Sequence, residues 1–194
     1  MPSIMTSRQA AELDYAFERN GFTPGLVKKL SKGDTLELVK EVLLGHAEIK
    51  RKLFLVDLDA DPVMPEGHSL ATHRKDGKFK YDPKKVRLYL SPEQLKGKTV
   101  VGNDLYMSVR DRPVMNSNML DFYLRNQHLI DRSWNGKVVV FWGTVYRDAF
   151  GRPCVACLYW AVGEWKSRLL PLDSTMYAGY FAAEFVEQST ARNH

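Results

Sequence analysis

The chain of 194 residues is 44% hydrophobic, 26% charged and 11% aromatic, and its formal net charge is +5. These values fit one folded domain, or a domain with an appendage, and they exclude an intrinsically disordered chain. Two cysteines exclude a disulfide framework, and no apolar run reaches the roughly 18 to 20 residues that span a bilayer. We therefore expect a cytoplasmic protein with no secretory signal and no membrane partner.

Three short helices are predicted in the first 50 residues. Thr6 or Ser7 caps a first helix with one apolar stripe. Thr23 followed by Pro24 has the cap and first-turn pattern that opens a second helix. Asp34, with a glutamate three residues later, predicts a capping box at the start of a third helix.

A strand is expected at 53–58, where an unbroken apolar run ends in acidic residues. Residues 61–85 hold several prolines and glycines among charged residues, so we predict a long, irregular, basic connection. A further strand at 86–90 and a one-turn helix at 91–95 are predicted to follow it.

A second helical region is predicted before the last third of the chain. A short helix is expected at 103–109. Asn116 or Asn118 then caps a longer helix whose apolar side includes Met119 and Phe122.

The strongest local pattern is a three-stranded β-meander at 137–148, 152–162 and 165–172. These segments are rich in valine and aromatic residues, and they are separated by short turns that contain glycine. Period-two alternation divides the first strand into two apolar sets, Val138, Val140, Trp142 and Tyr146 against Val139, Phe141 and Val145. A strand with two apolar faces is expected in the interior of its sheet, covered by helices.

The predicted fold class is therefore α+β. A three-helix segment at 1–50 precedes a core at 51–194 with a mixed or antiparallel sheet, the meander and packed helices. We expect the two segments to form one compact unit.

Two stretches carry a resemblance to a known family. MTSRQAAELDYAFERNGFT with the residues after it, Met5 to Ile49, and FWGTVYRDAFGRPCVACLYW, Phe141 to Trp160, resemble the opening and closing segments of a family of short hypothetical proteins from genomes of uncultured bacteria. This sequence departs from the family after Trp165, where the family has a more tryptophan-rich stretch. The resemblance implies Met5 as an alternative start, and it implies no activity, cofactor or catalytic residue.

One segment accounts for the positive charge of the chain. Residues 70–98 contain nine basic and three acidic residues, an excess of six positive charges, so the remainder is close to neutral. Phe79, Tyr81 and Tyr89 are interleaved with these cations, and cations with aromatic rings are typical of nucleic-acid binding. We predict a non-enzymatic RNA- or DNA-binding or accessory domain whose phosphate contacts are Arg74, Lys75, Lys78, Lys80, Lys84, Lys85 and Arg87.

An alternative prediction is a metal-dependent hydrolase or phosphotransferase. Asp57 and Asp59 follow an apolar strand, and alternate carboxylates at a strand end are the ligand type that Mg²⁺ or Ca²⁺ requires. An EF-hand loop is excluded because Pro62 and His68 occupy the positions of its glycine and its last glutamate.

A third alternative is a structural or partner-binding protein, which forms homo-oligomers through exposed meander aromatics such as Tyr159 or Trp165. Cys154 and Cys157 lie three residues apart in a predicted strand, where their side chains face opposite ways, so we assign them to packing. No catalytic residue is assigned, because no nucleophile elbow, phosphate-binding loop or dinucleotide fingerprint occurs in the sequence.

Overall fold

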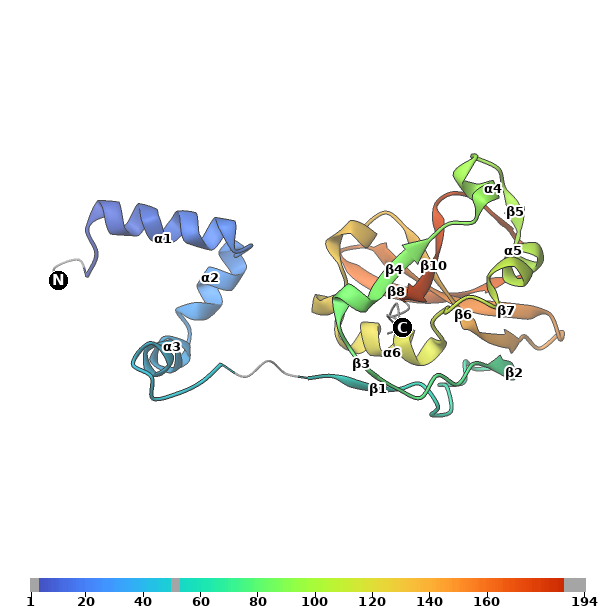
Figure 1. The fold of residues 1–194 in the computed structure, drawn as a ribbon, viewed down its shortest axis with the longest axis horizontal. Helices are drawn as coiled ribbons and strands as arrows, with labels where there is room; N and C mark the ends of the chain where they lie inside the picture. The colour runs from blue at the N-terminus through green and yellow to red at the C-terminus, as the bar shows by residue number, and fades with distance from the viewer. Residues whose placement is uncertain (1–3, 50–52, 187–194) are drawn as a thin grey trace, which may run out of the picture. The chain divides into compact units, whose positions relative to one another are not determined.

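The computed structural model describes residues 4–49 and 53–186, and the chain divides into two compact units, Met1–Lys52 and Leu53–His194 (Figure 1). The fold is α+β, with a helical N-terminus ahead of the sheets, as the sequence predicted. No helix within the described residues has both the length and the apolar composition needed to cross a membrane.

The N-terminal unit contains the three predicted helices, α1 (Ser7–Arg19), α2 (Pro24–Leu30) and α3 (Thr35–Leu43). The Thr6 and Thr23 side chains accept hydrogen bonds from backbone N–H groups three residues on, because both residues are extended and aim their hydroxyls at the first turn. The capping box predicted at Asp34 is wrong. Asp34 has φ −87° and ψ 11°, outside the extended conformation of a side-chain cap, and it makes no side-chain cap hydrogen bond.

The helices of this unit have no core of their own. None of the described residues in α1, α2 or α3 is buried, and apolar side chains such as Leu36 and Leu43 are 57% and 81% exposed. Helices of this length are marginally stable without tertiary packing, so local capping carries much of their stability.

The C-terminal unit is built on one large sheet. Its order is β4-β10-β6-β7-β8, and β2 pairs with the second half of β6. The strands and helices that carry the sheet are β2 (Ser69–His73), β4 (Val86–Tyr89), α4 (Pro92–Leu95), α5 (Gly102–Val109), α6 (Ser117–Arg125), β6 (Val138–Arg147), β7 (Pro153–Ala161), β8 (Glu164–Pro171) and β10 (Tyr180–Phe185). Short elements complete the unit, namely β1 (Leu55–Asp57), β3 (Lys78–Lys80), η1 (Pro83–Lys85), β5 (Val100–Val101), η2 (Gln127–Leu129), η3 (Arg132–Trp134) and β9 (Thr175–Met176).

The predicted meander is β6, β7 and β8, and β6 lies in the interior of the sheet with apolar residues on both faces. The sequence did not predict β10, which lies between β4 and β6, antiparallel to β4 and parallel to β6. Its sequence, YFAAEF, is short, has one charged residue and shows no apolar–polar alternation, and the strand pairs with strands that are distant in the chain.

A β-bulge in β6 corrects the predicted faces of this strand. The register shifts between Phe141 and Val145, so that the strict alternation ends at the bulge. Tyr146 therefore packs in the same cluster as Val139 and Phe141, whereas Val145 packs with Val140. The assignments of Tyr146 and Val145 by period two were wrong, because the three extra residues of β6 at 142–144, an odd number, reverse every face beyond them.

Two apolar clusters lie on the two faces of the sheet. Helix α6 covers one face, where Met119 and Tyr123 pack with β6, β7 and β1. Helix α5 covers the other face, where Leu105 and Val109 pack with Trp142 and with β9. Cys154 and Cys157 belong to different clusters, as their spacing predicted.

The connection predicted to be irregular at 61–85 contains two strands. β2 pairs with β6 beyond its bulge, and β3 forms a two-stranded ribbon with β1 (Figure 1). Both strands are short and polar, and backbone pairing with distant strands orders them although their own sequences give little strand pattern. The prediction of an exposed Trp165 is also wrong, since its side chain is 5% exposed and packs edge-on against Trp160.

Candidate ligand-binding sites

The seven cations predicted to contact phosphates are four exposed lysines, two ion-paired arginines and one half-buried lysine. Lys75, Lys78, Lys80 and Lys84 are exposed, and none of them has a carboxylate partner within 4.0 Å among the described residues. Arg74 and Arg87 are held in ion pairs, with Asp76 at 2.8 Å and with Glu184 at 3.1 Å. The half-buried Lys85 follows Lys84 in η1. Among the described residues, the structure therefore separates four exposed lysines that have no carboxylate partner from two arginines that are held in ion pairs.

The β1–β3 ribbon brings acidic residues beside the basic segment. Asp57 lies opposite Lys78 in the ribbon, and the Asp59 carboxylate accepts a hydrogen bond from Gly77 N at 2.8 Å. The same pairing leaves Lys80 opposite the apolar Leu55. The positive charge is thus partly offset at one end of the ribbon and not at the other.

Asp57 and Asp59 organise backbone in this loop. Asp57 Oδ1 accepts from the N–H groups of Asp59 and Ala60 at 3.0 and 3.2 Å, as in an Asx turn. Across 4–49 and 53–186, no group of three or more His, Cys, Asp or Glu side chains is arranged to hold a metal ion. The Mg²⁺ or Ca²⁺ site stays a prediction.

The aromatic residues of the basic segment pack inward. Phe79 contacts Phe185 with ring centroids 4.7 Å apart, and the Tyr81 hydroxyl donates to the Leu129 carbonyl at 2.9 Å. The guanidinium of Arg112 covers Tyr89 at 3.6 Å from the ring centroid. These three rings stabilise the fold, so a base that stacks on this protein needs a different ring.

Such a ring lines a cavity of about 270 Å³, which we name the arginine cavity. It lies where β2, α5 and the bulge of β6 meet, and its walls are Thr72, His73, Arg74, Tyr106, Arg110, Val114, Trp142 and Gly143. Tyr106 is half-buried and stacks on the buried Trp142, with an interplanar angle of 29° and centroids 6.3 Å apart. The cavity therefore combines two guanidinium groups with an aromatic wall.

The guanidinium groups of the two arginines in this cavity differ in their protein partners. Arg74 is fixed by Asp76 and by the carbonyl of Arg112, to which its Nη1 donates. Arg110 is 49% exposed, and its nearest carboxylate, that of Asp111, is 3.8 Å away and 90% exposed. A solvated pair at this distance contributes little stability, so the Arg110 guanidinium is available to an anion.

A buried hydrogen-bond chain crosses the sheet at the bulge. His73 Nε2 lies 3.1 Å from the Leu58 carbonyl, which only accepts, so Nε2 carries a proton, and in the tautomer with this single proton Nδ1 is an acceptor. The Thr144 hydroxyl, 2.8 Å from Nδ1, therefore donates to it. Thr144 Oγ1 in turn accepts from Ser117 N and Ser117 Oγ, both at 3.0 Å. The direction of every bond in the chain follows from the carbonyl at its end.

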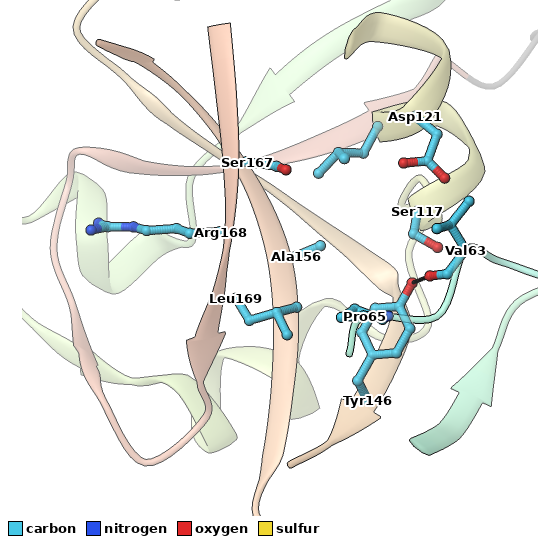
Figure 2. A pocket seen from close by; sticks show the side chains of 10 residues that line it. Val63, Pro65, Ser117, Asp121, Tyr146, Ala156, Ser167, Arg168 and Leu169 are labelled. Carbon is cyan, nitrogen blue, oxygen red and sulfur yellow. Dashed lines mark hydrogen bonds between the residues drawn. The ribbon is translucent and has the colours of Figure 1, made fainter. Parts of the chain in front are cut away.

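Ser117 lies at the wall of a second cavity, of about 290 Å³, which we name the Asp121 cavity (Figure 2). Its lining residues come from α6, β6, β7, β8 and the loop after β1, and they are Val63, Pro65, Ser117, Leu120, Asp121, Tyr146, Ala156, Ser167, Arg168 and Leu169. Figure 2 shows Ser117 and Asp121 on the same side of α6, with the Tyr146 hydroxyl bonded to the Val63 carbonyl.

Burial raises the pKa of two acidic groups in this cavity, Asp121 and Tyr146. Desolvation raises the pKa of Asp121 above its usual value, and the more distant Arg125 only partly offsets it. Desolvation likewise raises the pKa of Tyr146. Perturbed groups in a concave site are candidates for ligand contact. The buried Cys157, by contrast, has its pKa raised by desolvation to about 11, which suits a packing residue.

Comparisons of the chain with protein-family models, with curated proteins and with solved structures found no match. The sites therefore stand on geometry alone. Sequence reasoning missed Tyr106, Arg110, Ser117 and Asp121, because no motif joins them. One indication of Ser117 and Asp121 was present in the sequence, namely Asn116 as a predicted helix cap. The cap begins α6, whose first residues are buried.

Proposed function

We propose that the C-terminal unit binds single-stranded nucleic acid at the arginine cavity. The observation that carries the proposal is the convergence of Arg74 and Arg110 on a cavity whose wall includes Tyr106. Guanidinium groups neutralise phosphates, and an aromatic ring gives a base a stacking surface worth roughly 1–3 kcal/mol. Bases in a duplex are already stacked, so this combination favours a single strand.

The exposed lysines support the proposal as a path for the phosphate backbone. Lys75 directly follows Arg74, and Lys78 and Lys80 flank Phe79 on β3, whose ring packs inward. Alternate residues of a strand share a face, so Lys78 and Lys80 point to solvent together. Flexible, exposed cations bind phosphates without sequence preference, and their contribution falls with salt.

The direct test is fluorescence anisotropy with labelled single-stranded RNA and DNA over a series of salt concentrations. We compare wild type with Arg110→Gln, and with Arg132→Gln as a control for an exposed arginine of the same unit outside the cavity. Arg110→Gln is expected to weaken binding and to reduce the slope of log K against log salt by about 0.7, the value for one single-strand phosphate. Arg132→Gln is expected to leave the slope unchanged.

The lysine path is tested by replacing Lys75, Lys78, Lys80 and Lys84 together with glutamine. The slope is expected to fall by up to about 3, since four contacts contribute about 0.7 each. The matched control replaces Lys28, Lys29, Lys32 and Lys40 of the N-terminal unit, which are also exposed. Absence of binding at low salt, or equal losses in Arg110→Gln and Arg132→Gln, would refute the proposal.

A further inference from the structure

We propose that the Asp121 cavity binds an alkylammonium group, with the carboxylate of Asp121 as its counter-ion and the apolar wall around its alkyl part. Val63, Leu120 and Leu169 form apolar walls of the cavity. Asp121, which also lines it, projects from α6 (Figure 2). The volume of about 290 Å³ is enough for a small organic cation or for the end of a long side chain. This proposal is independent of nucleic-acid binding.

The charge of the cavity comes from one side chain. Arg168 contributes to the lining, but Figure 2 shows its side chain directed to the other side of β8, where its guanidinium lies 5.1 Å from the Tyr159 ring centroid. Arg125 donates from Nε to the backbone carbonyl of Asp121, and no cation of the described residues lies within 4.0 Å of the Asp121 carboxylate. A cation is therefore the ligand whose charge complements this site.

The hydroxyl groups of Tyr146 and Ser117 also favour a ligand that donates hydrogen bonds. Tyr146 donates its proton to the Val63 carbonyl at 3.3 Å, and Ser117 donates its proton to Thr144. Both hydroxyl protons are thus engaged, and the lone pairs of both oxygens remain as acceptors. An ammonium group has three donors and no acceptor, so it matches these oxygens and the Asp121 carboxylate, whereas a carboxylate or a phosphate would find a free hydroxyl donor in the lining only at the exposed Ser167.

The residues around the Asp121 cavity also favour a positively charged ligand. A neighbouring cavity of about 460 Å³ shares Val63 and Asp121 with this one, and Asp57 and Asp61 line it together with Arg125. Three carboxylates against one guanidinium attract a cation toward the shared wall. Desolvation raises the pKa of Asp121 in the empty cavity, so a bound cation would relieve an unfavourable charge.

The test uses three probes of the same shape on the full chain, n-butylammonium, n-butanol and butyrate. Binding is followed by amide NMR shifts of residues such as Ser117, Leu120 and Ser167. Butylammonium alone is expected to shift these resonances in a saturable manner. Asp121→Asn is expected to weaken its binding by about tenfold to a hundredfold, as for the loss of one charge-assisted hydrogen bond.

The control variant is Asp173→Asn, which removes an exposed carboxylate outside the cavity and is expected to bind butylammonium as wild type does. A glycine-rich peptide with one lysine identifies the source of the ammonium group. Binding of the peptide at least as tightly as the amine indicates a protein side chain, and binding of the amine alone indicates a free small molecule. Equal shifts with butanol or butyrate, or undiminished binding by Asp121→Asn, would overturn the proposal.

Discussion

Thr144→Val is a sharp test of the buried hydrogen-bond chain. Valine has nearly the shape of threonine but lacks the hydroxyl, and Thr144 is fully buried. The change removes three hydrogen bonds at once, to His73 Nδ1, Ser117 N and Ser117 Oγ. It also leaves the buried N–H of Ser117 without this partner, at the start of α6.

The expected loss follows from these bonds. Each contributes about 0.5–1.5 kcal/mol net, so their sum is about 2–4 kcal/mol of the free energy of unfolding. For a chain of this size each kcal/mol lowers the Tm by about 2–4 °C, which predicts a decrease of roughly 4–16 °C. Ser117→Ala removes one of the three bonds and is expected to cost about 1 kcal/mol.

Urea unfolding monitored by tryptophan fluorescence measures these differences, since Trp134, Trp142 and Trp165 are buried. The double variant is expected to lose less than the sum of the two single losses, because both changes remove the same Ser117–Thr144 bond. Thr99→Val, at an exposed position, is the control. A Thr144→Val variant within about 0.5 kcal/mol of wild type would refute the chain as a stabilising element.

Three further variants have definite expected outcomes. Gly143→Ala places a Cβ 2.9 Å from the backbone of Asn116, so we expect a loss of about 1–3 kcal/mol in urea unfolding. Val162→Asn is expected to raise stability by about 1 kcal/mol, because the exposed Val162 has φ +52° in a two-residue turn with Gly163; an unchanged Tm would contradict this. For Asp121 the folded pKa is raised, so the fold binds more protons than the unfolded chain and loses stability as the pH rises above the usual value of 3.8. Asp121→Asn should therefore raise the Tm at neutral pH, with the gain vanishing in acid, and a lower Tm at neutral pH would contradict the sign.

The elements that the sequence predicted well are those set by local chemistry. Thr23 with Pro24, and Ser91 with Gln94, fix the starts of α2 and α4 through hydrogen bonds within one turn. The meander was predictable because its turns are short and its strands are neighbours in both sequence and space.

The elements that the sequence did not predict depend on distant partners. Glu184 of β10 is fully buried, and its charge is met by Arg87 and Arg112, which lie 97 and 72 residues away. Only the folded chain shows why a glutamate is tolerated in the middle of the sheet, since a buried charge requires its partners. The half-burial of Asp121 was likewise not predictable from the sequence, because the walls of its cavity come from several strands and a loop.

The position of β10 has a consequence for the order in which the C-terminal unit can be completed during synthesis. β10 is the last strand of the described chain, yet it lies between β4 and β6. Until it leaves the ribosome, the facing edges of β4 and β6 have no partner along this stretch, and open strand edges promote association between chains. A nascent chain stalled before Tyr180 would thus expose the unpaired edges of β4 and β6, which lie inside the completed sheet. Completion of the unit awaits almost the whole of its sequence.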